Sequence, residues 1–118
     1  MANSSVFLVE DDALIRMMVT DMLEELGFSV VAQAGNVDDA IRLAQSTEFD
    51  FAILDVNLDG KDVTPVADVI KALNRPFIFA TGYGAAGLPE AYRDRPVLQK
   101  PFLIEKLAEK IDGYRGKR

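Results

Sequence analysis

The chain has 118 residues, the size of a single domain. It contains no cysteine and no histidine, which excludes disulfides, zinc sites built on thiolate or imidazole, and catalytic triads that use histidine. A net charge of -6 argues against binding to the phosphate backbone of a nucleic acid. No apolar run is long enough to cross a membrane, and residues 1–5 lack the features of a secretory signal. We therefore expect a cytoplasmic protein with neither nucleic-acid nor membrane partners.

Short apolar runs alternate with amphipathic helical patterns from one end of the chain to the other. Residues 6–9 form the first predicted strand. The helix that follows is predicted to begin at the capping residue Asp12 and to end at Gly27. Its apolar positions are expected to face inward: Leu14, Ile15, Met18, Val19, Met22, Leu23 and Leu26. Its charged positions, among them Arg16, are expected to face solvent, and the methionines at 17, 18 and 22 to pack in the core.

The same alternation continues through the rest of the chain. Strands are predicted at 28–34, 51–54, 77–80 and 97–99, and helices at 37–44, 64–73 and 103–111. Asn36 is a predicted helix cap, and Thr64 a second one, with Pro65 at the first helical position. Residues 57–60 are expected to form a loop. Between 81 and 89 the chain is rich in glycine, so a fourth helix there should be short or disordered.

Five strands that alternate with helices predict an α/β fold. The expected architecture is a doubly wound, five-stranded parallel sheet with helices on both faces, formed by residues 1–118 as one domain with no effector domain. In such folds the functional site lies at the carboxyl ends of the strands, near the point where the strand order reverses. The residues that directly follow the strands are therefore the candidates for function.

Those positions hold three acids, a hydroxyl and an amine: Glu10, Asp11, Asp55, Thr81 and Lys100. Carboxylates that lie close together repel one another, and a divalent cation relieves that repulsion. Oxygen ligands without histidine or cysteine favour Mg²⁺, with Mn²⁺ as an alternative, over zinc. A lysine and a threonine hydroxyl opposite such an ion suit the oxygens of a phosphoryl group. The pattern predicts a Mg²⁺-dependent phosphoryl site.

Four motifs occur in order at these predicted strand ends. They are Phe7 to Asp12, Ile53 to Leu58, Thr81-Gly82 and Lys100-Pro101-Phe102. Together they resemble the receiver domain of two-component response regulators, over nearly the whole chain. The resemblance implies a flavodoxin-like fold and a protein that takes a phosphoryl group from a sensor histidine kinase. It further implies that the signal leaves through a downstream protein target or a phosphotransferase, and that any enzymatic activity is limited to self-phosphorylation and slow autodephosphorylation.

The same resemblance implies a role for each matching residue. Asp55 would be the phosphoacceptor and a Mg²⁺ ligand, and Asp11 a direct ligand of the ion. Glu10 would reach the ion through water, and Asn57 would offer its backbone carbonyl. Lys100 would pair with the phosphoryl group, and Thr81 would hydrogen-bond one of its oxygens.

Residues 76–84 and 96–102 also resemble the "FAT GUY" receivers, which are often single-domain proteins. In ordinary receivers the last strand carries an aromatic residue that moves on activation, whereas this chain has Val97 at that position. Valine has no ring to move, so the usual coupling between threonine and an aromatic residue is in question here. One hypothesis is that residues 82–93 become ordered when Thr81 engages the phosphoryl group.

Two other functions are compatible with the residues. The first is a phosphorylation-independent protein-binding module with the same fold, although decayed receivers tend to lose residues of the set that Asp11, Asp55 and Lys100 complete here. The second is a Mg²⁺-dependent phosphohydrolase or a flavin protein. The flavin version fits poorly, because the turn after the first strand carries acids where a phosphate-binding loop needs glycine and free N–H groups.

Overall fold

The computed structural model describes residues 5–58, 60–81, 88–92, 97–100 and 105–109. Its main sheet contains β1 (Ser5–Val9), β2 (Ser29–Ala34), β3 (Phe51–Asp55), β6 (Phe77–Thr81) and β7 (Val97–Gln99). The strands lie in the order β2-β1-β3-β6-β7, and every pairing between them is parallel. The predicted α/β fold with a five-stranded parallel sheet is therefore confirmed, and its topology is flavodoxin-like.

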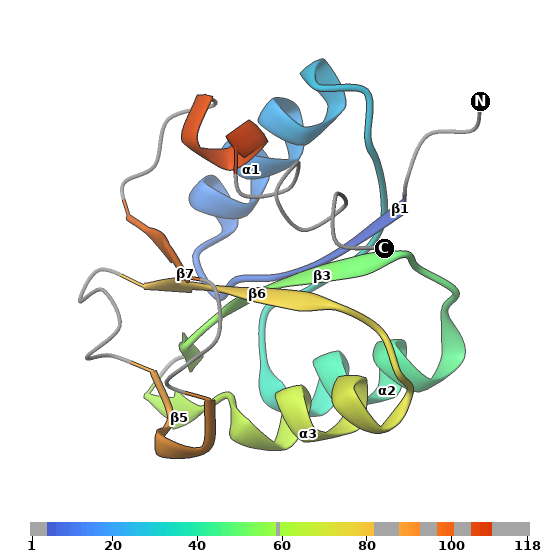
Figure 1. The fold of residues 1–118 in the computed structure, drawn as a ribbon, viewed down its shortest axis with the longest axis vertical. Helices are drawn as coiled ribbons and strands as arrows, with labels where there is room; N and C mark the ends of the chain where they lie inside the picture. The colour runs from blue at the N-terminus through green and yellow to red at the C-terminus, as the bar shows by residue number, and fades with distance from the viewer. Residues whose placement is uncertain (1–4, 59, 82–87, 93–96, 101–104, 110–118) are drawn as a thin grey trace.

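Helices cover both faces of this sheet (Figure 1). Helix α1 (Ala13–Glu25) lies on one face together with the helical residues 105–109, while α2 (Val37–Ser46) and α3 (Thr64–Ala72) lie on the other. Since β1 has β2 on one side and β3 on the other, the strand order reverses beside β1. The carboxyl ends of β1 and β3 therefore flank the crevice where folds of this kind bind their ligands.

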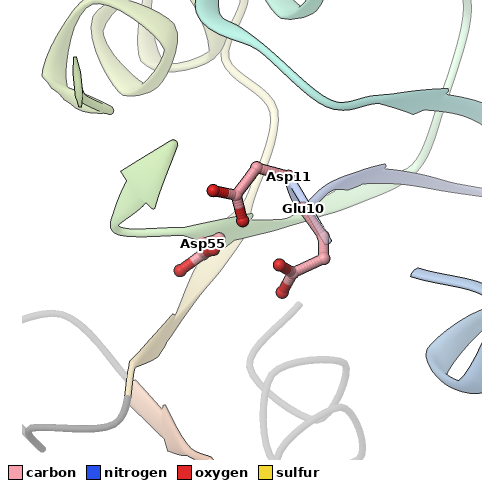
Figure 2. A group of neighbouring side chains, drawn as sticks. All are labelled: Glu10, Asp11 and Asp55. Atoms are coloured by element: carbon pink, nitrogen blue, oxygen red, sulfur yellow. The ribbon is translucent and has the colours of Figure 1, made fainter. Parts of the chain in front are cut away.

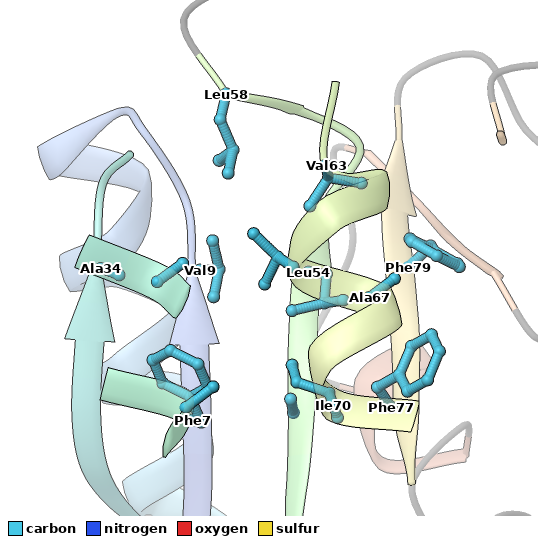
Figure 3. Close-up of a cluster of buried hydrophobic side chains, with 14 of the residues drawn as sticks. Phe7, Val9, Ala34, Leu54, Leu58, Val63, Ala67, Ile70, Phe77 and Phe79 are labelled. Carbon is cyan, nitrogen blue, oxygen red and sulfur yellow. The ribbon is translucent and has the colours of Figure 1, made fainter. Parts of the chain in front are cut away.

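Alternation along the strands divides the apolar residues between two cores. In β1, Phe7 and Val9 belong to the core under α2 and α3 (Figure 3), whereas Val6 and Leu8 belong to the core under α1. All four are essentially inaccessible to solvent. Full burial of such side chains stabilises a fold by about 1.5–3 kcal/mol each. The sheet is thus held from both sides, which fixes the positions of the strand ends.

The edge strand β2 contains an irregularity in its pairing with β1. Val6 pairs with Val30, but Phe7 pairs with Ala32, so Val31 is an extra residue. Val31 is accordingly one of the exposed large apolar side chains. A bulge of this kind interrupts the regular edge that another strand would need for pairing.

The helix boundaries confirm some of the predicted caps and correct one. Asp12 accepts hydrogen bonds from the N–H groups of Leu14 and Ile15, and Asn36 accepts one from Asp39, as predicted. Gly27 follows α1 with a φ of +93°, a conformation that favours glycine. The prediction for Thr64 is wrong: this residue is already helical, and its N–H and hydroxyl both donate to the side chain of Asp62.

The inward face predicted for α1 is also partly wrong. Leu14, Met17 and Met18 are 61%, 56% and 49% exposed, so they do not pack in the core. Arg16, predicted to face solvent, is half-buried. A helix turns by about 100° per residue, which puts Met18 and Arg16 at opposite margins of the stripe that Ile15, Val19 and Met22 define. At such margins the apolar pattern alone does not decide which side chain is covered.

The remaining connections add a hairpin and one short helical turn. Part of the loop predicted at 57–60 instead forms β4 (Asn57–Leu58), which pairs antiparallel with β5 (Lys61–Asp62) between β3 and α3. The described part of the connection from β6 to β7 contains a single 3-10 turn, Glu90–Tyr92. Most of the stretch predicted as a short or disordered helix, residues 82–87, lies outside the described residues. No helix among the described residues has the length and apolar character needed to cross a membrane.

Candidate phosphoryl and metal site

Three carboxylates converge where β1 and β3 end. Glu10 and Asp11 directly follow β1, and Asp55 is the last residue of β3. One carboxylate oxygen from each residue lies within 4.8 Å of the other two. Figure 2 shows Asp11 reaching from the end of β1 toward Asp55, with Glu10 beside them. Glu10 and Asp55 are buried, while Asp11 is exposed, so the group opens to solvent on the Asp11 side.

Lys100 closes the opposite side of this group. It follows β7, and its Nζ lies 2.7 Å from Oε1 of Glu10 and 3.3 Å from Oδ2 of Asp55. Its main chain is held by the strand ladder, since its N–H donates to the carbonyl of Thr81 at 2.8 Å. The other carboxylate oxygen of Glu10 accepts the N–H of Asp12 at 3.0 Å. The side chain of Glu10 is therefore bound through both of its oxygens.

The surroundings of Asp55 and Lys100 shift the pKa values of both groups. Its burial, and then the negative charge of Glu10, raise the pKa of Asp55 to about 7, although Lys100 and the N–H of Asn57 act in the opposite direction. Burial by itself would lower the pKa of Lys100, but its hydrogen bond to Glu10 and the charge of Asp55 outweigh burial and raise it. Burial and the neighbouring negative charge thus disfavour the ionised form of Asp55.

Thr81 and Asn57 complete the set of predicted residues around Asp55. Thr81 is the last residue of β6 and is buried, and its predecessor Ala80 pairs with Asp55 in the sheet. Asn57 lies two residues beyond Asp55, and its N–H donates to Oδ1 of that residue at 3.4 Å. The structure therefore gathers the predicted residues at one edge of the sheet, while their chemical roles remain predictions.

The donor set fits a hard divalent cation. Three carboxylates with oxygens this close repel one another, and the ammonium of Lys100 contacts two of them, Glu10 and Asp55. Mg²⁺ is bound through oxygen ligands and usually keeps several waters, which the open Asp11 side allows. Glu10, Asp11 and Asp55 are the described residues that could hold such an ion.

Two neighbouring residues were not predicted to belong to this region. The guanidinium of Arg16, on α1, donates to the main-chain carbonyl of Glu10 at 2.6 Å. Gly35, at the end of β2, leaves space for that guanidinium. A signal for Gly35 was present in the sequence, because a glycine between a strand and a helix cap often marks a close approach of two parts of the chain.

Comparison with known proteins identifies the class. The family model of the response regulator receiver domain matches residues 6–112, and this chain belongs to that family. Proteins of this kind act in two-component signalling and are signalling proteins, not conventional enzymes, and the family binds Mg²⁺ at an acidic pocket.

Individual relatives support the same assignment. The solution structure of SdrG from Sphingomonas melonis Fr1 is 41% identical, with a TM-score of 0.83 over 95% of this chain and 96% of that one. The BeF3-activated conformation of SdrG from Pseudomonas melonis Fr1 is 40% identical, with a TM-score of 0.82 over 96% of this chain and 97% of that one. The transcriptional regulatory protein PdtaR of Mycobacterium tuberculosis is 32% identical over 91% of this chain. This chain spans about half the length of PdtaR, 54%.

Proposed function

We propose that this protein accepts a phosphoryl group from a sensor histidine kinase on Asp55, in a reaction that depends on Mg²⁺. The observation that carries the proposal is the convergence of Glu10, Asp11 and Asp55 within 4.8 Å, with Lys100 in contact with two of them. A receiver that had lost this chemistry would not need to keep so much charge at one strand edge. The BeF3-activated conformation of SdrG, 40% identical, supports the proposal.

In the proposed step an Oδ atom of Asp55 attacks the phosphorus of a phosphohistidine on the kinase. A P–O bond forms, giving an acyl phosphate, while the P–N bond breaks and its electron pair returns to the imidazole of the kinase. The reaction needs little from the receiver beyond positioning and neutralisation of charge. A bound Mg²⁺ would neutralise the acids and polarise the phosphoryl oxygens.

The residues of this chain would each supply a different part of the arrangement. Asp11 and Asp55 would bind the ion directly, Glu10 through water, and Asn57 through its backbone carbonyl. Lys100 already lies 3.3 Å from Asp55, so its ammonium is near the place where an incoming phosphoryl oxygen would accept a charge-assisted hydrogen bond. Thr81, from the neighbouring strand, would donate its hydroxyl to another phosphoryl oxygen.

We further propose that the phosphorylated domain acts in the cytoplasm, where its kinase draws on ATP. It would pass its signal on by docking to a protein target or by giving the phosphoryl group to a phosphotransferase. The exposed apolar residues of α1, Leu14, Met17 and Met18, support a role in protein contacts.

Phosphotransfer from candidate kinases tests this function. The wild type should gain one phosphoryl group in the presence of Mg²⁺, and intact-mass spectrometry should detect it. Asp55→Ala should gain none, whereas Asp38→Asn, at an exposed acid on α2, should behave as wild type. Label retained on Asp55→Ala would show that another residue is the acceptor. If beryllofluoride with Mg²⁺ leaves the amide spectrum of the wild type unchanged, the protein is a phosphorylation-independent binding module.

A further inference from the structure

The acidic group depends on a main-chain turn whose support comes from α1. Glu10 lies one residue beyond β1, and its N–H still donates to the carbonyl of Ala34 on β2 at 3.0 Å. Beyond Ala34 the neighbouring strand ends, and the chain turns toward the cap of α2. The carbonyl of Glu10 therefore lies where the strand ladder stops, and a buried carbonyl needs a donor.

Arg16 supplies that donor. Its Nη1 lies 2.6 Å from the carbonyl oxygen of Glu10, six residues earlier in the chain. This carbonyl belongs to the peptide group that joins Glu10 to Asp11. A planar guanidinium that holds it restricts the rotation of that peptide group, and this rotation sets the direction in which the Asp11 side chain leaves the backbone.

Gly35 shows that space is reserved for this contact. A Cβ atom at position 35 would lie 3.0 Å from Nη1 of Arg16 and 3.7 Å from the carbonyl oxygen of Glu10. Among the described glycines a positive φ occurs at Gly27 and Gly60, and Gly35 does not have one. Alanine could adopt the backbone conformation at position 35, so glycine matters here because of the room it leaves.

We infer that Arg16 is a positioning residue for the divalent cation, and that it acts by holding the Glu10–Asp11 peptide group in the orientation that turns Asp11 toward Asp55. This inference rests on the proposed Mg²⁺-dependent function. Arg16 itself is not a ligand of the ion, because its guanidinium has no acceptor and carries a positive charge. Outer groups of this kind typically change metal affinity by about 10–100-fold when they are removed.

The sign of the effect separates positioning from simple electrostatics. If Arg16 acted through its charge alone, removing that positive charge from beside the acidic group would strengthen Mg²⁺ binding. Loss of positioning should instead weaken Mg²⁺ binding. Arg16→Met removes both the charge and the hydrogen bond, whereas Arg16→Lys keeps the charge but lacks the rigid planar donor group.

The experiment is a titration of the intact chain with Mg²⁺ alone. Calorimetry measures the affinity, and NMR monitors the amide signals of Asp11 and Asp12. Arg16→Met and Arg16→Lys should each bind Mg²⁺ about 10-fold more weakly than the wild type. Arg42→Met provides a matched control, because this exposed arginine on α2 contacts Asp39 and should leave the affinity unchanged. The amide signal of Asp11 should shift in both Arg16 variants before any metal is added.

Gly35→Ala keeps the inference testable if the Arg16 variants fail to fold. The added methyl group presses on the guanidinium from the side of β2, so this variant should also weaken Mg²⁺ binding. Where Arg16→Met does fold, adding Gly35→Ala to it should cause no further loss of Mg²⁺ affinity, because the contact that the methyl group disturbs is already gone.

The possible failures are distinguishable. Wild-type affinity in Arg16→Met, tighter binding in that variant, or full recovery in Arg16→Lys would each overturn the positioning role while leaving the proposed function intact. A wild type that does not respond to Mg²⁺ would overturn the proposed function and this inference together.

Discussion

Replacing Asp55 with asparagine should stabilise the magnesium-free protein at about pH 8 and have little effect near pH 4. The reason is the environment of the carboxylate. Burial and the charge of Glu10 raise the pKa of Asp55 from 3.8 to about 7 in the folded chain. Because folding raises the pKa of Asp55, this acid ionises more readily in the unfolded chain than in the folded one. The free energy of unfolding therefore falls as the pH rises from about 4 to about 7.

The magnitude follows from the same shift. A difference of one in pKa corresponds to about 1.4 kcal/mol, so the move from 3.8 to about 7 sets an upper bound of about 4 kcal/mol. Solvent at the open side of the site and the nearby Lys100 screen the charge, and we expect about 2 kcal/mol. For a chain of this length that corresponds to a rise of about 8 °C in Tm.

Urea unfolding followed by circular dichroism, without divalent cations, measures this effect. The difference in the free energy of unfolding between Asp55→Asn and the wild type should be near zero at about pH 4 and reach its full value above about pH 7. Asp38→Asn should show no such trend, because it replaces an exposed acid outside the site. A difference independent of pH, or an Asp55→Asn variant less stable than the wild type at about pH 8, would refute the reasoning.

Three further changes test other parts of the structure. Asp11→Ala should weaken Mg²⁺ binding in calorimetry and leave the Tm of the metal-free protein unchanged or raised, because it removes one of three repelling acids; a strongly lowered Tm would contradict this. Asp12→Ala should cost about 1 kcal/mol in urea unfolding through loss of the α1 cap, and unchanged stability would show that the cap does not matter. Tyr92→Phe should cost about 1–2 kcal/mol in the same assay, because the buried hydroxyl donates to Asp68; a neutral result would mean that water replaces the bond at no cost.

The centre of the sheet could be predicted from the sequence because β1, β3 and β6 are short runs of mostly apolar, buried residues. Residues 51–54 show this most clearly: all are buried, and Asp55 follows them at the end of the strand. The placement of the acids came from the same rule, since parallel strands end at one edge. The helix caps Asp12 and Asn36 were predicted correctly because each bonds to backbone N–H groups two or three residues further along the chain, so that the cap depends on local sequence alone.

What could not be predicted depends on contacts between distant parts of the chain. Lys100 and Glu10 are 90 residues apart, and their ion pair appears only once β7 has been placed in the sheet. Arg16 resembles any other charged residue on an amphipathic helix until the end of β2 is known to leave a carbonyl without its strand partner. Thr64 does not cap α3, because its N–H and its hydroxyl both donate to the carboxylate of Asp62, two residues earlier.

The charges of the three acids connect the proposed metal binding to the proposed phosphoryl transfer. With all three acids ionised, their carboxylates repel one another, and one divalent cation would relieve that repulsion. Part of that repulsion can be relieved without metal if Asp55 takes up a proton, as its raised pKa allows, but a protonated Asp55 is a poor nucleophile. In the proposed reaction, metal binding would therefore also keep Asp55 in the ionised form that attacks phosphorus. If Arg16 holds Asp11 toward Asp55 as inferred, the site would bind Mg²⁺ at lower concentrations of the ion.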